Sequence, residues 1–166
     1  NNGVLKYLYD NQSLKEIGYV EGKDLVFSGK VQSFNKEGTL ITERQYYQGR
    51  LEGLEKVFSE DGKLEEERMY KNNLIDGEEI YYYEDGKIAQ KSQYIGDKKE
   101  GKSISYYENG EILAEISYKN NKRDGAYFLY YENGIKKEEG YFKNDKLEGI
   151  SKLYYESGKI RTEKIL

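Results

Sequence analysis

Glutamates recur at a fixed interval along this 166-residue chain, and they are the first candidates for chemistry. The series is Glu43, Glu67, Glu115, Glu139 and Glu163, and Lys91 stands at its missing place. Two carboxylates about 5–10 Å apart across a cleft can hydrolyse a glycosidic bond. Because these acids form a regular column and not a pair, we interpret them as structural. A carboxylate-based hydrolase is kept as a remote alternative.

Tyrosines form a second series, at Tyr83, Tyr107, Tyr131 and Tyr155, with Tyr9, Asn35 and Ser59 at the matching places earlier in the chain. Rigid rings with polar tips suit the binding of protein surfaces, extended peptides or sugars. We therefore predict that these four tyrosines lie on strands, point their hydroxyls outward and line a binding face. The alternative is that they only cover the second face of a one-layer sheet.

Other kinds of chemistry are excluded by composition, because the chain has no histidine, cysteine, proline or tryptophan. Relays based on His or Cys, and ordinary zinc, copper, haem or iron–sulfur sites, need those residues. We therefore expect no enzyme activity, no cofactor and no metal. The net charge of −4, with both signs interspersed, would not gather phosphates. Nucleic acid is not expected as a partner, and neither is a membrane.

A repeat positions both series. Glycines stand 24 residues apart, at Gly29, Gly53, Gly77, Gly101, Gly125 and Gly149, and we call them the leading glycines. They divide the chain into repeats 3–28, 29–52, 53–76, 77–100, 101–124 and 125–148, with a terminal hairpin at 149–166. A second glycine follows each leading glycine after nine residues, commonly in Asp-Gly or Asn-Gly. Such pairs predict a β-hairpin with a type I′ turn.

The connections between hairpins contain Lys71-Asn72-Asn73, Lys119-Asn120-Asn121 and Lys143-Asn144-Asp145, which favour turns. The first repeat departs from the pattern in two ways. Gln12 stands where the turn glycine belongs, and two additional residues fall within Val20 to Ser28.

Two ring columns should pack repeat upon repeat. One is Leu8, Phe34, Phe58, Tyr82, Tyr106, Tyr130 and Tyr154; the other is Tyr46, Tyr70, Tyr94, Tyr118, Phe142 and Leu166. By strand parity, Leu40, Leu64, Ile88 and Ile112 should face the same side as the second column. In the repeat led by Gly125, Ile135 comes one position early and Lys136 holds the aliphatic place, so we expect a local bulge or register shift there.

These features predict an all-β fold, an elongated single-layer antiparallel sheet of tandem β-hairpin repeats forming one domain over residues 1–166. A hydrophobic content of 36% is low for a thick core, whereas 19 tyrosines and five phenylalanines are too many for a disordered chain.

The string Tyr106-Tyr107-Glu108-Asn109-Gly110, followed by Glu115, Tyr118-Lys119-Asn120-Asn121 and Gly125, resembles one copy of the bacterial variant of the MORN (membrane occupation and recognition nexus) repeat. Comparable strings start at Tyr82, Tyr130 and Tyr154. The resemblance implies a sheet of successive hairpins. It also implies a scaffold or interaction module, because the repeat carries no catalytic motif.

We therefore expect a non-catalytic scaffold that binds a protein or a glycan. An intracellular antitoxin-type protein inhibitor is the alternative. The chain starts at Asn1 and not at Met, which is what removal of a signal peptide would leave, so an exported or cell-surface location is favoured over the cytoplasm.

Overall fold

The computed structural model describes residues 2–165, and the chain divides into two compact units, Asn1–Gly86 and Lys87–Leu166. The first unit contains β1 (Gly3–Leu8), β2 (Leu14–Glu21), β3 (Val26–Phe34), β4 (Leu40–Tyr47), β5 (Arg50–Leu51), β6 (Gly53–Phe58), β7 (Leu64–Lys71) and β8 (Leu74–Tyr82). The second contains β9 (Ile88–Ile95), β10 (Lys98–Tyr106), β11 (Ile112–Lys119), β12 (Lys122–Tyr130), β13 (Lys136–Lys143), β14 (Lys146–Tyr154) and β15 (Ile160–Ile165).

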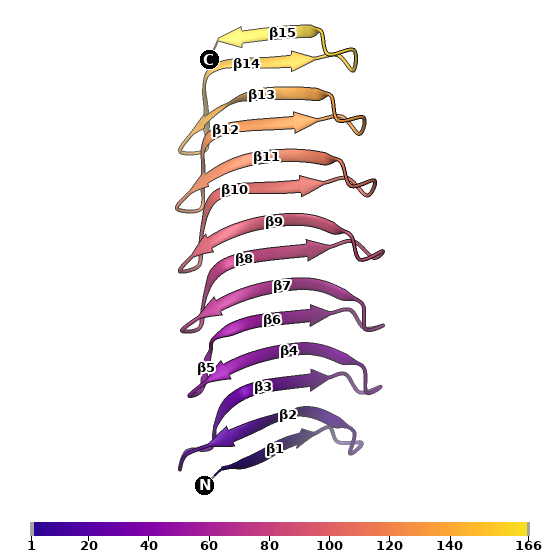
Figure 1. The fold of residues 1–166 in the computed structure, drawn as a ribbon, viewed down its shortest axis with the longest axis vertical. Helices are drawn as coiled ribbons and strands as arrows, with labels where there is room; N and C mark the ends of the chain where they lie inside the picture. Colours follow the sequence, from indigo (N-terminus) through magenta and orange to yellow (C-terminus); the bar gives the residue numbers. More distant parts are fainter. Residues whose placement is uncertain (1, 166) are drawn as a thin grey trace. The chain divides into compact units, whose positions relative to one another are not determined.

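Within each unit, every strand pairs antiparallel with the next in a single open layer (Figure 1). The short β5 is the exception, because it pairs with β4 and lies off the main path. Residues 2–165 contain no helix, and hence none that could cross a membrane. The predicted all-β class and the single layer of consecutive hairpins are confirmed. The assignment of residues 1–166 to one domain stays a prediction.

Two kinds of turn alternate along the chain, and the sequence-based assignment of type I′ turns to the glycine loops was wrong. In the loop after β10, the Gly110 amide donates to the carbonyl of Tyr107 at 2.9 Å, and only Gly110 has a positive φ, of 90°. This is the loop in which a type I turn is followed by a left-handed glycine. Gln12 takes the same role in the first repeat, with φ of 67°.

Type I′ geometry is found instead at the opposite ends of the hairpins. Asn72 and Asn73 form a two-residue loop between paired Lys71 and Leu74, with φ of 50° and 68°. In each unit these two-residue turns lie at the left of Figure 1, and the glycine loops lie at the right. The two extra residues of the first repeat make its connection longer, because Glu21 pairs with Val26 across four residues.

The two faces of the sheet differ in burial. Within each unit, the buried side chains lie on one face, which we call the core face. They are Val20, Val31, Glu55, Glu66 and Glu79 in the first unit, and Ser92, Ser103, Ala114, Tyr127 and Phe142 in the second. Tyr106 lies on the other face, which we call the outer face. The second ring column belongs to the core face, and its predicted last member, Leu166, is outside the described residues.

The predicted side for Leu40, Leu64 and Ile112 was wrong, and that for Ile88 stays a prediction. Ile112 pairs with Tyr106, whereas Ala114 pairs with Ser105, so Leu113 is an unpaired bulge residue. Paired residues of antiparallel strands share a face, and a bulge reverses the parity after it. Ile112 therefore lies on the outer face with the first ring column, while Tyr118 lies on the core face. Leu40 and Leu64 likewise pair with Phe34 and Phe58.

The register shift expected for the repeat led by Gly125 is present between Leu129 and Tyr130, but it is not particular to that repeat. Tyr130 pairs with Lys136 in the register that Tyr106 keeps with Ile112. Lys136 occupies the aliphatic place through a different interaction, because its ammonium lies 4.8 Å from the centroid of the Phe128 ring and 2.6 Å from a Glu139 oxygen. A cation over an aromatic ring thus replaces an aliphatic contact.

Charged groups occupy the middle of the core face in Asn1–Gly86. The Arg44 Nε lies 2.6 Å from a Glu55 oxygen, and the other Glu55 oxygen lies 3.5 Å from Arg68. Arg68 also contacts Glu66, and its Nε lies 3.4 Å from Glu79. The equivalent place in Lys87–Leu166 holds Ser92 and Ser103, with hydroxyls 2.9 Å apart, and then Tyr127 opposite Gly140.

Candidate functional site

The predicted binding tyrosines lie at the glycine loops, one residue beyond the strands. β10 ends at Tyr106, and Tyr107 opens the turn, where its amide donates to the carbonyl of Glu111 at 2.8 Å. The next loops are built in the same way by Tyr131 and Tyr155. We call this side of the sheet in Lys87–Leu166 the tight-turn edge, made by residues 107–111, 131–135 and 155–159.

The hydroxyls of Tyr107 and Tyr131 do not point outward as predicted. The Tyr107 hydroxyl donates to the carbonyl of Tyr130 at 2.7 Å, and the Tyr131 hydroxyl donates to the carbonyl of Tyr154 at 2.8 Å. In the first unit, Tyr9 donates to the carbonyl of Phe34 at 2.9 Å. Each of these hydroxyls therefore bonds one repeat to the next, because it reaches the carbonyl of the last residue of the equivalent strand in the next repeat.

Not all four predicted tyrosines lie together. Tyr107 and Tyr131 line one surface hollow of about 390 Å³ with Glu132, Asn133 and Glu156. Tyr155 follows on the same edge and is 53% exposed. Tyr83 belongs to the other unit, where it lines a separate hollow with Tyr82, Ser59, Asp61 and Lys63. Their role in binding stays a prediction.

Cations already approach two rings of the tight-turn edge. The Lys137 ammonium lies 5.6 Å from the centroid of the Tyr131 ring, and the Arg161 guanidinium lies 5.7 Å from that of Tyr155. Both cations sit at the unpaired bulge position that follows each glycine loop. Leu113 occupies this position in the repeat of Tyr107, so the bulge residue of that repeat is not a cation that could approach the Tyr107 ring.

The carboxylates of this edge differ from those of the repeating glutamate column. Glu115 is 3.0 Å from the Lys102 ammonium and accepts a bond of 3.0 Å from the Tyr130 hydroxyl. Glu139 is held in the same way by Lys136 and Tyr154. By contrast, within residues 2–165 no ion pair involves Glu108, Glu132 or Glu156, and all three residues are exposed. The glutamate column is thus structural, whereas the edge carboxylates have no cation partner.

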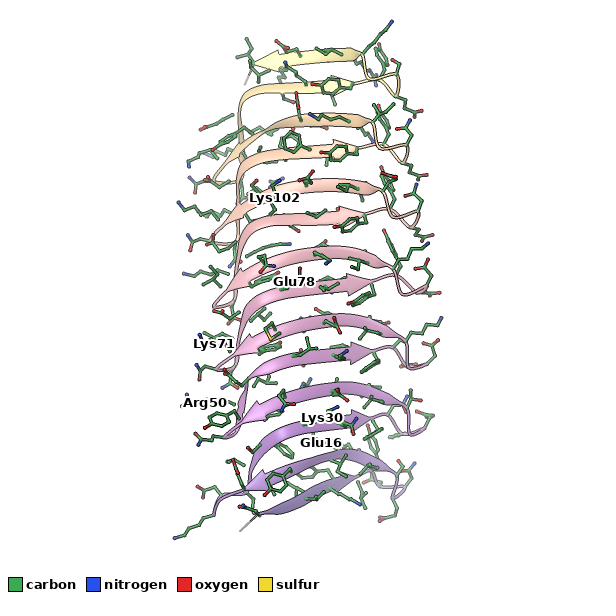
Figure 2. All side chains as sticks on the ribbon, in the orientation of Figure 1. Glu16, Lys30, Arg50, Lys71, Glu78 and Lys102 are labelled. Carbon is green, nitrogen blue, oxygen red and sulfur yellow. The ribbon has the colours of Figure 1, made fainter. Side chains whose placement is uncertain are left out.

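Lysine partners set the ionisation of the glutamate column. The Lys102 ammonium beside Glu115 holds the pKa of that carboxyl below its ordinary value, and the Lys136 ammonium does the same for Glu139. Lys30 lowers the pKa of Glu43 in the first unit. Lys30 and Lys102, labelled in Figure 2, occupy equivalent positions of two repeats. The pKa of a tyrosine partner is raised instead. The hydrogen bond to Glu139, and then burial, raises the pKa of Tyr154 to about 12.

These shifts predict lower stability in acid. A carboxyl whose pKa is lower in the folded than in the unfolded chain stabilises the fold above its unfolded pKa, and this contribution is lost as pH falls through the folded pKa. We expect the free energy of unfolding, from urea melts, to decrease from pH 5 to pH 3. The decrease should be smaller in the double variant Glu115→Gln with Glu139→Gln. An identical pH dependence in that variant and the parent would contradict this assignment.

A family comparison now bears on the repeats. The family model described as the MORN repeat variant matches residues 51–72, 75–95, 99–120, 123–144 and 147–164, more than half of the chain. The chain belongs to the MORN repeat variant family. The match confirms the resemblance seen in the sequence, and the MORN repeats at 99–120 and 123–144 carry Tyr107 and Tyr131. A search of curated proteins gave no match.

Sequence reasoning missed an acidic column that holds the MORN hairpins together. An acidic residue precedes five of the six leading glycines: Glu52, Asp76, Glu100, Asp124 and Glu148. The Glu52 and Glu100 carboxylates accept the Asn72 and Asn120 amides, each at 2.8 Å, and so satisfy the first residue of a type I′ turn. The 24-residue alignment contains this signal. Sequence reasoning also missed the charged residues of the core. Arg44 and Arg68 are 24 residues apart, and so are Glu55 and Glu79.

Proposed function

We propose that this MORN repeat protein is a non-catalytic scaffold that binds another protein through its tight-turn edge. One observation carries the proposal: Tyr107 and Tyr131 frame a hollow whose other residues are Glu132, Asn133 and Glu156, and these carboxylates have no ion pair within residues 2–165. Aromatic side chains beside polar groups are typical of protein-binding surfaces. The family supports the coarser statement, because MORN repeats generally serve as scaffolds and binding modules.

The hydrolase alternative finds no support in the glutamate column. A glycosidase acid needs a raised pKa, so that it carries a proton at neutral pH. The pKa values of Glu43, Glu115 and Glu139 are lowered by their lysine partners. Burial raises the pKa of Glu66, but this residue is only 7% exposed and contacts Arg68 on the core face. Within residues 2–165, no group of three or more side chains is suited to hold a metal ion.

The test compares loss of the rings with loss of the hydroxyls. Peptides selected from a displayed library against the full chain are measured by biolayer interferometry on two double variants. Tyr107→Ser with Tyr131→Ser removes both rings, whereas Tyr107→Phe with Tyr131→Phe keeps them and loses only the inter-repeat hydrogen bonds. We expect about tenfold or greater weakening for the serine variant and less than about threefold for the phenylalanine variant, because a buried aromatic anchor contributes most of its free energy through its ring.

The control removes two exposed tyrosines elsewhere, in Tyr47→Ser with Tyr141→Ser; these residues are 61% and 44% exposed. This variant should bind like the parent, and circular dichroism should show that every variant keeps its sheet. Selected peptides that bind the ring-less variant with parental affinity would overturn the proposal. Binding on a parallel glycan array, without any peptide binder, would favour a glycan partner instead.

A further inference from the structure

The chemistry of the tight-turn edge indicates what kind of segment it binds. Three successive loops each begin with a tyrosine that is followed in the sequence by a glutamate: Tyr107-Glu108, Tyr131-Glu132 and Tyr155-Glu156. Glutamates of the other column are neutralised internally, but within residues 2–165 these three carboxylates form no ion pair. Lys87 approaches one loop, but there its ammonium bonds the main-chain carbonyl of Glu108 at 2.8 Å.

The rings favour the same ligand as the carboxylates. Tyr131 and Tyr155 each have a cation within 5.7 Å of the ring centroid, so the chain itself uses these ring faces to hold positive charge. Tyr107 and Glu132 line the same hollow, and burial, followed by the Glu132 charge, raises the pKa of Tyr107. The hollow at Tyr107 thus combines a ring with the carboxylates of Glu132 and Glu156. A positively charged side chain entering it would meet both cation–π and ionic partners.

The spacing of the loops selects the conformation of the ligand. Successive MORN hairpins are two strands apart, which is about 10 Å at the usual distance between strands. An extended polypeptide advances about 3.3 Å per residue, so every third residue also advances about 10 Å. A segment lying across the loops would therefore place residues i, i+3 and i+6 on Tyr107, Tyr131 and Tyr155 in turn.

We infer that the tight-turn edge binds an extended polypeptide segment that carries arginine or lysine at every third position. This inference rests on the proposed function and adds the charge and period of the partner. The carboxylates attract the segment, and the ring spacing fixes its register. Because the edge is exposed, affinity should decrease as salt is added.

The experiment uses two fluorescein-labelled peptides of identical composition and measures binding to the full chain by fluorescence anisotropy. The periodic peptide is three copies of Ser-Arg-Thr in tandem, and the block peptide is Ser-Thr-Ser-Arg-Arg-Arg-Thr-Ser-Thr. We expect the periodic peptide to bind about tenfold more tightly, because only its arginines can meet three loops at once. Equal affinity of the two peptides would show that net charge alone is recognised and would overturn the inference.

Charge variants test the site itself. The triple variant Glu108→Gln, Glu132→Gln and Glu156→Gln should weaken binding of the periodic peptide about tenfold or more. A matched control, Glu21→Gln, Asp24→Asn and Glu148→Gln, removes the same charge elsewhere and should change affinity less than about threefold. Unchanged binding by the first variant, or equal losses in both, would contradict the inference. If library binders need the rings while the arginine peptide does not bind, the proposed function stands and this inference fails.

Discussion

Arg68→Ala should lower the free energy of unfolding by about 3–5 kcal/mol, because it leaves buried carboxylates without their cation. Glu55, Glu66 and Glu79 are 3%, 7% and 5% exposed, and Arg68 contacts all three. Arg44 also contacts Glu55, but within residues 2–165 no ion pair joins it to Glu66 or Glu79. Urea melts of the parent and the variant measure the difference.

Two further variants separate the loss of charge from the loss of packing. Arg68→Met keeps most of the aliphatic volume, so it should remain nearly as unstable as Arg68→Ala if the uncompensated charges dominate. Adding Glu66→Gln and Glu79→Gln to Arg68→Met should recover a large part of the loss, because neutral side chains no longer need the guanidinium. Arg68→Met as stable as the parent would contradict this account of the core.

Acid should affect the Arg68→Ala variant and the parent differently. Burial already raises the pKa of Glu66, so without the guanidinium the folded chain should bind a proton at Glu66 more readily than the unfolded chain does. Stability then increases as pH falls toward the ordinary range of a carboxyl group. The parent should change less between pH 7 and pH 5, because its lysine-paired glutamates lose their contribution only when pH falls below this range, through their lowered pKa values. Melts at pH 7 and pH 5 test this difference.

The sequence was sufficient for the hairpins because the 24-residue period of glycine fixes where each strand ends. It was misleading for the turns, since Asn-Gly suits a type I′ turn as well as the last two residues of a three-residue loop. The structure distinguishes them by the Gly110 amide, which bonds the carbonyl of Tyr107. The predicted face of Ile112 was wrong for a related reason. Strand parity assumes a regular ladder, and the bulge at Leu113 breaks it.

The candidate site was predicted only in part. The period identified Tyr107 and Tyr131, but the bonds from their hydroxyls to Tyr130 and Tyr154 depend on how hairpins stack, which no single repeat encodes. The exposed carboxylates of Glu132 and Glu156 could not be separated from the neutralised column by sequence, since both series have the same period. Only the positions of the lysine partners distinguish them.

Size complementarity in the core gives the second large effect. A Cβ added to Gly140 would lie 2.7 Å from Cε1 of Tyr127, its paired residue on β12. Gly140 has no positive φ, so backbone conformation does not require glycine here. We therefore expect Gly140→Ile to destabilise the fold by about 3 kcal/mol or more through overpacking alone.

The preceding repeat supplies the compensating change. Ser103 pairs with Ile116 at the places where Tyr127 pairs with Gly140, so a small residue opposite a large one recurs with the sizes exchanged. Tyr127→Ser alone should cost about 3–5 kcal/mol, because it leaves a cavity beside Phe142, whose ring centroid is 4.7 Å from that of Tyr127. Combined with Gly140→Ile, it recreates the Ser103 and Ile116 pair, and the double variant should be more stable than either single one. A double-mutant cycle in urea measures this coupling, for which we expect about 2 kcal/mol or more. Additive losses would show that the two side chains do not share one space, and that the core of each MORN repeat is not set by pairs of complementary size.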